Sequence, residues 1–259
     1  MITLNEQNYF SLEAELEYMS NHLWGNFMEC EAKTMATLKG EYEQPDRECF
    51  KVGHIMEAVI QGRDYTEIEG IYQKNEKLYA WASKAVAMAE RAKKDKMFMS
   101  MMTGEAQGIY TGEIAGLAWK CKTDCVNHET QAITDLKSTK DFEDDWMVVD
   151  GKNKKVAWYH IHGYQRQLLI QRELVEQKTG LEYLTLIAGV TKQDPPDIAL
   201  VLFDDEDAFG RELFEIELRA ERVKAVWKGK EKSIPCGKCD WCRGVKVLTN
   251  FEVAESLYK

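Results

Sequence analysis

Three charged residues near the middle of the chain have the types and the spacing of a metal-dependent hydrolytic site. Asp124 stands at the end of one expected β-strand, and Asp135 and Lys137 stand two residues apart at the end of the next. Side chains two apart on a strand point to the same face, and hairpin pairing can bring Asp124 beside them. Two carboxylates suit Mg²⁺ or Mn²⁺, and a neighbouring lysine can position or activate the attacking water. The pattern indicates phosphodiester cleavage; the alternative is a surface hairpin with a cross-strand salt bridge.

A second group of reactive side chains lies in the segment CGKCDWC (236–242), which holds three of the seven cysteines. The first ten residues have neither a basic flank nor an apolar run, so we expect no signal peptide and a reducing cytoplasm, where disulfides are rare. Three thiolates at this spacing can bind one metal centre, but a tetrahedral zinc ion or a four-iron cluster needs a fourth ligand. The alternative is that these cysteines are free thiols.

Composition limits the partners that the protein can have. The chain has 259 residues with 34 Lys plus Arg and 44 Asp plus Glu, a formal net charge of -10. This charge argues against a protein that coats nucleic acid or an anionic membrane with its whole surface. We expect no membrane span, because no run of about 18 apolar residues occurs. Between Arg219 and Lys246, however, nine Lys or Arg face three Asp or Glu, which indicates either a phosphate-contacting segment or merely a basic helix end.

The elements that must position these residues form one expected domain over 1–259. A helical layer over about 1–105 includes helices over 19–38 and 76–96, the latter capped by Asn75. A core over about 106–205 includes two or three antiparallel strands within 108–137, a helix over about 156–178, and strands over 183–190 and 198–203. A helix over 206–227 and the Cys-rich segment complete the chain, to residue 259. This order predicts an α/β fold, a small mixed sheet flanked by helices.

Several short motifs resemble a known nuclease superfamily. GEIAG (112–116), WKCKTD (119–124) and TDLKST (134–139) resemble the core motif of the PD-(D/E)XK nucleases. Within that superfamily the chain is similar to the RecE-type phage and prophage exonucleases, the exodeoxyribonuclease VIII group of the RecB-like nucleases. The segments that carry this likeness are YQRQ (164–167), QKTG (177–180), AGVTK (188–192), PPDI (195–198) and CGKCDWC (236–242). The resemblance extends from about Met19 to Leu248.

The resemblance implies a restriction-endonuclease-like core and metal-dependent resection of duplex DNA ends in phage or prophage recombination. On this interpretation Asp124 and Asp135 hold Mg²⁺ or Mn²⁺, and the carbonyl of Leu136 adds a ligand. Lys137 positions or activates the attacking water.

A third side-chain ligand of the metal is also implied. In the RecB-like group a histidine four residues after a glycine is a further ligand. Here Glu57 occupies that position relative to Gly53, and His54 follows the glycine directly. We favour Glu57 because its helical position matches, and His54 remains open.

DNA contacts and partners are implied as well. The group has a Gln-x-x-x-Tyr motif; Gln167 fits it, and Gln171 stands where the tyrosine is expected. Helical spacing places Tyr164, Gln167 and Gln171 on one face, so we expect this face to bind DNA. The implied partners are duplex DNA ends and a single-strand annealing protein, and homo-oligomers form in related exonucleases.

Some RecB-like nucleases, including the AddB subunit and CRISPR-adaptation nucleases, have an iron–sulfur staple made of one early cysteine and three late ones. Cys30 stands where the early cysteine would be. The resemblance therefore implies a 4Fe-4S cluster on Cys30, Cys236, Cys239 and Cys242, with Zn²⁺ as the alternative.

A competing class is a non-enzymatic DNA-binding or recombination-scaffold protein, in which the Cys-rich segment binds and the acidic hairpin is structural. The enzyme is favoured because a binder has no need of Asp124, Asp135 and Lys137 together.

Overall fold

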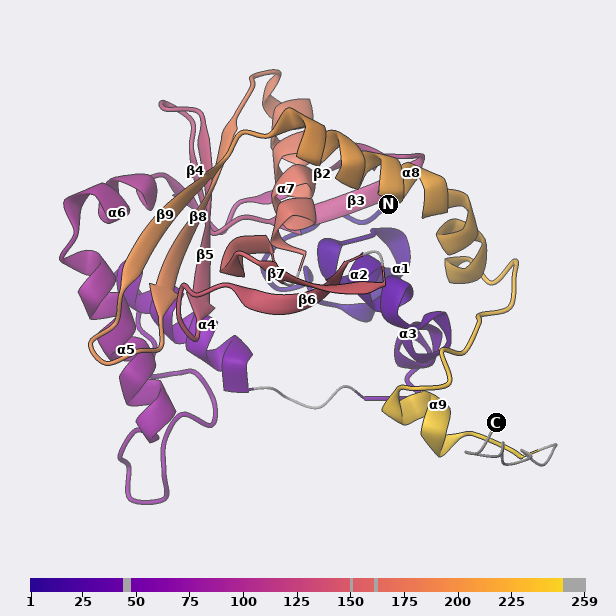
Figure 1. The fold of residues 1–259 in the computed structure, drawn as a ribbon, viewed down its shortest axis with the longest axis horizontal. Helices are drawn as coiled ribbons and strands as arrows, with labels where there is room; N and C mark the ends of the chain where they lie inside the picture. Colours follow the sequence, from indigo (N-terminus) through magenta and orange to yellow (C-terminus); the bar gives the residue numbers. More distant parts are fainter. Residues whose placement is uncertain (44–47, 150, 161–162, 249–259) are drawn as a thin grey trace, which may run out of the picture.

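A mixed β-sheet forms the centre of the protein, and helices cover both of its faces (Figure 1). The computed structural model describes residues 1–43, 48–149, 151–160 and 163–248, and within them this sheet has five strands in the order β1-β4-β5-β8-β9. β5 and β8 run parallel, and the other neighbours are antiparallel. The predicted α/β class with a small mixed sheet is therefore confirmed. The strands are β1 (Glu105–Ala106), β4 (Cys125–Asn127), β5 (Ala132–Thr139), β8 (Leu184–Thr191) and β9 (Ile198–Phe203).

The predicted N-terminal helical layer is present, with different boundaries. The helix expected over 19–38 is two helices, because the backbone of Cys30 is extended and separates α2 from α3. The helix expected from residue 76 begins only at Ala80, and Asn75 caps a turn before it by accepting from the N–H of Lys77. The helices are α1 (Leu12–Glu17), α2 (Asn21–Glu29), α3 (Glu31–Leu38), α4 (Glu48–Ile60), α5 (Ala80–Lys93) and α6 (Lys96–Met101).

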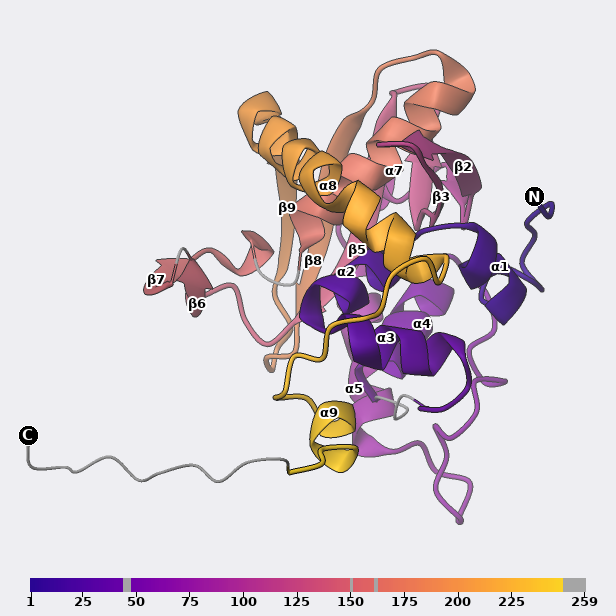
Figure 2. The same ribbon diagram turned by 90° about the vertical axis from the view of Figure 1, so that its right-hand side faces the viewer.

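The helix predicted over 156–178 starts later than expected. α7 (Tyr164–Thr179) lies between Gly163 and Gly180, both left-handed. The preceding residues form the hairpin of β6 (Asp145–Val149) and β7 (Lys152–Val156), which projects from the body of the molecule (Figure 2). The two apolar strands predicted over 183–190 and 198–203 are present as β8 and β9.

Two further helices follow the sheet. α8 (Glu206–Trp227) has the predicted bounds, and the short α9 (Asp240–Gly244) carries the last cysteine of the Cys-rich segment. The expected end of that segment, 249–259, lies outside the described residues. Figures 1 and 2 both place α9 beside α3, although the two are about two hundred residues apart in the chain.

A separate hairpin of β2 (Ile109–Ile114) and β3 (Leu117–Lys122) leads into the central sheet. Its two-residue turn uses left-handed Ala115 and Gly116, a conformation that matches the twist of paired strands. The hairpin packs against α7 and directs the chain after β3 toward Asp124.

The sheet separates two hydrophobic clusters. In β8, Ile187 belongs to the cluster that contains α7 and α8, whereas Ala188 and Val190 belong to the cluster of α4 and α5. Strands that are covered on both faces lose contact with water, and this suits the parallel pair β5 and β8. Side chains at the end of β5 therefore enter a packed interior. No helix in the described part of the chain is both long and apolar enough to cross a membrane.

Candidate active site

The structure brings together the three charged residues that the sequence singles out. Asp124 directly precedes β4, which pairs antiparallel with β5, the strand that carries Asp135 and Lys137. The backbone N–H of Leu136 donates to Oδ2 of Asp124 at 2.7 Å. This bond fixes the Asp124 side chain beside the middle of β5. Asp135 is 2% exposed and Lys137 is half-buried, so the group lies at the edge of the core.

Two glutamines of α7 hold Asp135 in place. Oδ1 of Asp135 accepts from Nε2 of Gln167 at 2.7 Å and from Nε2 of Gln171 at 3.0 Å. The ammonium of Lys137 forms an ion pair with the other oxygen, Oδ2, and donates to Oε1 of Gln167 at 3.0 Å. Gln167 therefore bridges the acid and the lysine through the two ends of one amide.

The helix face predicted to bind DNA points into this group. The Lys137 ammonium lies 4.9 Å from the ring centroid of Tyr164, one turn before Gln167. Gln171 is 1% exposed, and its amide N–H donates a hydrogen bond to Asp135. Burial and this bond indicate that Gln171 positions the carboxylate, and its predicted DNA contact stays a prediction. Tyr164 and Gln167 are half-buried beside the reactive groups.

The electrostatics of the group favour an additional cation. Burial and the nearby Asp135 charge raise the pKa of Asp124 to about 8. Burial alone would lower the pKa of Lys137, but the charges of Asp135 and Asp124 outweigh it and raise that pKa. Lys137 is therefore an ammonium in this arrangement, but it does not suffice to keep both Asp124 and Asp135 ionised at close range. A cation between the acids would relieve their repulsion.

The donor set fits a hard divalent ion. Oδ2 of Asp135 is buried without a hydrogen-bond partner and forms an ion pair with the Lys137 ammonium. The N–H and C=O of a strand residue point to the same edge, so the Leu136 carbonyl faces the side on which Asp124 lies. Carboxylate and carbonyl oxygens are the ligands of Mg²⁺ and Mn²⁺. These residues fit the metal that the sequence predicts.

Glu57 fits a supporting position near the same ion. It lies on α4, is largely buried, and pairs with Arg63 at 2.8 Å. Burial raises the pKa of Glu57, Arg63 and Lys122 oppose this, and the charge of Asp135 adds to it. His54 lies one turn earlier and is exposed. Because Glu57 interacts electrostatically with the aspartates, we favour Glu57 over His54 as the third side-chain ligand of the metal.

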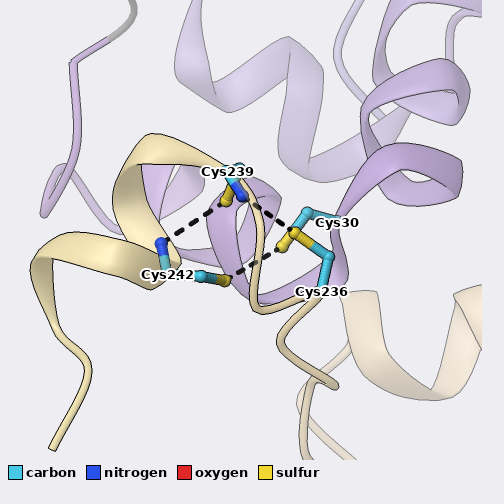
Figure 3. Close-up of side chains that lie close together, drawn as sticks. All are labelled: Cys30, Cys236, Cys239 and Cys242. Atoms are coloured by element: carbon cyan, nitrogen blue, oxygen red, sulfur yellow. Dashed lines mark hydrogen bonds between the residues drawn. The ribbon is translucent and has the colours of Figure 1, made fainter. Parts of the chain in front are cut away.

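Four sulfur atoms form a second centre, far from the first in sequence. Sγ atoms of Cys30, Cys236, Cys239 and Cys242 all lie within 4.8 Å of one another (Figure 3), and those of Cys30 and Cys242 are 3.5 Å apart. These four side chains lie close enough together to hold one metal ion. We call these four residues the cysteine knuckle.

Backbone N–H groups point at the sulfurs of the knuckle. Cys236 Sγ accepts from the N–H of Lys238 and of Cys239, and these bonds lower the pKa of Cys236 to about 6. The N–H of Lys33 likewise donates to Cys30 Sγ at 3.4 Å. Such bonds stabilise thiolates, the form in which cysteine binds metal.

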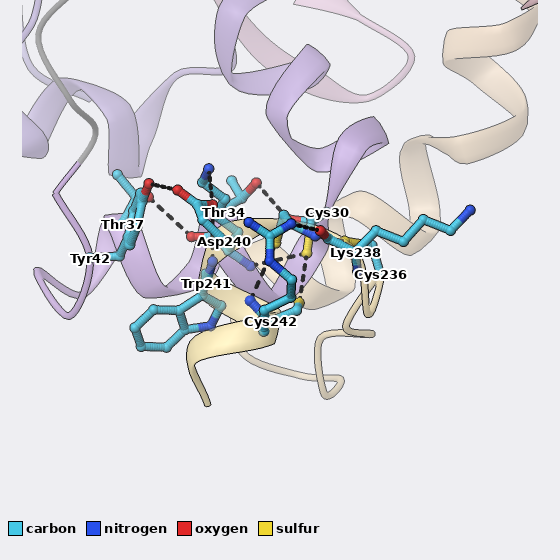
Figure 4. A network of polar contacts seen from close by, with 12 residues as sticks. Cys30, Thr34, Thr37, Tyr42, Cys236, Lys238, Asp240, Trp241 and Cys242 are labelled. Carbon is cyan, nitrogen blue, oxygen red and sulfur yellow. Dashed lines mark hydrogen bonds and ion pairs between the residues drawn. The ribbon is translucent and has the colours of Figure 1, made fainter. Parts of the chain in front are cut away.

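Polar contacts tie the knuckle to α3. Asp240 accepts from Nζ of Lys33 at 2.6 Å and from the hydroxyl of Tyr42 (Figure 4). The Trp241 ring lies edge-on to Tyr42, with centroids 5.9 Å apart. The C-terminal segment is therefore fixed to the N-terminal helices by side chains as well as by the four sulfurs.

The basic segment around the knuckle is occupied by internal contacts. Arg222 pairs with Glu31 at 2.7 Å, Lys224 donates to the carbonyl of Gly116, and Lys228 donates to the carbonyl of Leu16. These cations brace α8 against the N-terminal half. Of the two interpretations of the local charge, a phosphate-contacting face is thus less well supported than a structural role.

The family model of a PDDEXK-like domain of unknown function (DUF3799) matches residues 20–245. The chain belongs to this PDDEXK-like family. The DUF3799 chain is also similar to a crystal structure from Eubacterium rectale, described as a candidate exonuclease, with 29% identity and a TM-score of 0.90 over 98% of this chain and 97% of that one. The structure of SSO0001 matches with 12% identity and a TM-score of 0.28 over 82% and 88% of the two chains, too low to carry an argument. A search of curated proteins finds no match.

These findings confirm the PD-(D/E)XK nuclease superfamily and the restriction-endonuclease-like core that the sequence motifs predict. The assignment of Asp124 and the Asp135-Leu136-Lys137 triplet to the superfamily motif stays a prediction from the sequence. Lys122 was not predicted to belong to this site, yet its positive charge acts to lower the pKa of Glu57. Strand alternation offered a signal, because Lys122 lies two residues before Asp124.

Proposed function

We propose that this PDDEXK-like protein is a Mg²⁺- or Mn²⁺-dependent deoxyribonuclease of the RecE type that degrades duplex DNA from its ends. The observation that carries this proposal is the doubly hydrogen-bonded Asp135, held by Gln167 and Gln171 beside Asp124 and Lys137. A carboxylate that is fixed so firmly, and whose other buried oxygen accepts no hydrogen bond and pairs with the Lys137 ammonium, suits a metal ligand. The similar Eubacterium rectale structure, described as a candidate exonuclease, supports the same reaction class.

The residues divide the work of phosphodiester hydrolysis. Asp124, Asp135, the Leu136 carbonyl and Glu57 would hold the divalent ion, which as a Lewis acid stabilises charge on the phosphodiester and eases ionisation of water. The Lys137 ammonium orients the attacking water and neutralises charge on a phosphate oxygen. Gln167 fixes the distance between Lys137 and Asp135, and Gln171 fixes the orientation of the carboxylate. The ring of Tyr164 lies against the Lys137 ammonium.

One incubation series tests the proposal. Linear and closed-circular duplex DNA of the same sequence are each incubated with Mg²⁺, with Mn²⁺ or with EDTA. Metal-dependent loss of the linear form alone supports an exonuclease, and nicking of the circle indicates an endonuclease. Binding without degradation indicates the competing non-enzymatic DNA-binding class. Asp135→Asn should abolish cleavage, whereas Asp204→Asn, an exposed aspartate after β9, serves as the matched control.

We also infer that the cysteine knuckle binds a metal that staples the C-terminal segment to α3. Zn–S bonds of about 2.3 Å in a tetrahedron give sulfur separations of about 3.8 Å. Sulfurs that lie within 4.8 Å of one another are therefore close to the separation that one ion requires. The family resemblance implies a 4Fe-4S cluster instead. Such a cluster places iron atoms between the thiolates, so the four sulfurs would have to move apart. Anaerobic purification distinguishes the two: a brown protein with acid-labile sulfide supports the cluster, and a colourless protein with one zinc supports the ion.

The role in phage or prophage recombination, with a single-strand annealing protein as partner, extends the same proposal. Its support is the RecE-type likeness of the motifs. Co-purification with such a protein encoded beside it, and the mass of the free protein by light scattering, test the partner and the oligomer respectively.

A further inference from the structure

A cavity of about 590 Å³ is lined both by the two glutamines that hold Asp135 and by two cysteines of the cysteine knuckle. Gln167 and Gln171, which hold Asp135, line one end, and Cys30 and Cys239 line the other. Its walls come from the N-terminal segment, α2, α3, α4, β3 and α7. The cavity is thus a single space that adjoins both centres, and its volume admits a flexible chain of ligand size but not a duplex.

Aromatic rings stand in this cavity with much of their surface uncovered. Phe10, before α1, is 74% exposed, and Phe50, in the first turn of α4, is 52% exposed. The His22 ring on α2 lines the same space. Large exposed apolar rings in a concave polar site mark a binding surface, and unpaired nucleic-acid bases stack on such rings.

Two cations line the same cavity. Lys122, at the end of β3, is half-buried and close enough to Glu57 to act on its pKa. Nε of Arg166 donates a hydrogen bond to Oδ1 of Asn21 at 2.8 Å, and Arg166 also lines the cavity. Both positive groups adjoin the end at which Gln167 lies.

The remaining charged residues of the cavity have other partners or lie elsewhere in it. Lys33 is paired with Asp240, and Lys120 donates to the carbonyl of Tyr9. Glu15 and Glu29 also line the space. The cavity is therefore not uniformly basic. Its cations at the active-site end and its exposed rings together match a polyanion whose bases are free to stack.

We propose that this cavity binds a single-stranded segment of the DNA substrate, with bases stacked on Phe10 and Phe50 and the backbone beside Lys122 and Arg166. The inference rests on the proposed nuclease function and specifies its substrate: the strand that is cut reaches Asp124 and Asp135 unpaired. The cysteine knuckle forms the far wall of the binding site, which explains why a metal staple accompanies this site.

The test is equilibrium binding of fluorescently labelled oligonucleotides to the Mg²⁺-loaded protein in a Lys137→Met background, which keeps the metal ligands and slows cleavage of the probe. Phe10→Ala and Phe50→Ala should each weaken binding of a 12-nucleotide single strand by about 5- to 100-fold, the usual contribution of one base–aromatic stack. Phe50→Trp should retain affinity, and its fluorescence should be quenched by the oligonucleotide. Phe214→Ala removes a ring that is 60% exposed on α8, away from this cavity, and should leave affinity unchanged.

Unchanged single-strand affinity in both alanine variants, or an equal loss for a blunt duplex of the same sequence, would overturn the proposal. Circular dichroism confirms that each variant is folded, which the exposure of both rings leads us to expect. Cleavage by the parent protein is measured separately. If the parent protein cuts DNA but both alanine variants bind the single strand normally, only the proposal for the cavity is rejected. If the phenylalanines contribute to binding but the parent protein does not cut DNA, only the proposed nuclease function is rejected.

Discussion

Nε2 of Gln171 donates to Oδ1 of Asp135 at 3.0 Å, inside a part of the core where Gln171 is 1% exposed and Asp135 is 2% exposed. A buried carboxylate needs hydrogen bonds to stay ordered, and this one receives a bond from a helix that packs across the end of β5. The orientation of the candidate metal ligand thus depends on the packing of α7.

Gln171→Leu should lower kcat about 10- to 100-fold while the protein stays folded, because leucine fills the space but does not orient Asp135. This is the usual effect of removing a partner that orients a metal ligand. Steady-state cleavage and the affinity for Mn²⁺ measure it. Gln177→Leu is the matched control: Gln177 lies on the same helix and bonds to the backbone of Glu113 instead. Equal kcat in the two variants would show that Gln171 is only structural.

Lys137→Met should reduce cleavage by at least about 100-fold with little change in the affinity for DNA, because the ammonium acts on charge that develops during the reaction. Lys137→Arg should not restore activity, since the planar guanidinium cannot reproduce a compact ammonium in a site this closely packed. Single-turnover rates at saturating enzyme separate the chemical step from binding. A variant with the parent rate would remove Lys137 from the mechanism.

A packing constraint lies beside Lys137 on the neighbouring strand. A Cβ added to Gly189 of β8 would meet the Trp158 ring at 2.5 Å and the Phe142 ring at 3.0 Å. Gly189→Ala should therefore destabilise the protein by ~1–3 kcal/mol, as overpacking usually does. Gly210→Ala in α8, where a Cβ meets nothing within 4 Å, should be neutral or stabilise by up to ~1 kcal/mol. Urea unfolding of both variants checks the contrast.

The parts of the fold that were predictable have strong hydrophobic periods. β8, β9 and α8 alternate or repeat apolar residues against a covered face, and their bounds agree with the sequence to within one or two residues. The hairpin β6–β7 was missed because its side chains are mostly exposed and carry no such period; Trp146 and Val148 are 65% and 64% exposed. The predicted helix therefore began at Val156, the last residue of β7, instead of at Tyr164.

The site divides in the same way. Asp124, Asp135 and Lys137 were predictable because the two-residue period of a strand and one hairpin suffice to bring them together. The bonds of Gln167 and Gln171 to Asp135 were not, because they depend on how α7 crosses the sheet. Only the family resemblance related Cys30 to the late cysteines, since no local pattern spans the 212 residues from Cys30 to Cys242.

The raised pKa of Asp124 predicts how metal binding depends on pH. The value of about 8 in the folded, metal-free protein lies far above about 3.9 for a free aspartate. The folded state therefore holds a proton that the unfolded state has lost, and the free energy of unfolding falls as pH rises from about 4 to about 8. Metal must displace this proton, so the apparent Mn²⁺ affinity should rise up to about tenfold per pH unit below 8 and level off above it.

Titration calorimetry between pH 6 and pH 9 measures this dependence, and the protons released per metal report it independently in buffers of different ionisation enthalpy. Asp124→Asn has no such proton and should show weaker binding with a shallower pH profile. A parent affinity that does not change between pH 6 and pH 8 would contradict the raised pKa.

Cys30→Ser should remove the knuckle metal and loosen the C-terminal segment, because the remaining three thiolates leave the centre one ligand short. A structural metal contributes directly to folding, so the melting temperature should fall by several degrees or more and chelator should no longer lower it further. Elemental analysis and limited proteolysis measure the two effects, with cleavage expected between Trp227 and Cys236. Cys49→Ser changes an exposed thiol outside the knuckle and should retain both the metal and the melting temperature. If Cys30→Ser kept one equivalent of metal, the fourth ligand would have to be another group.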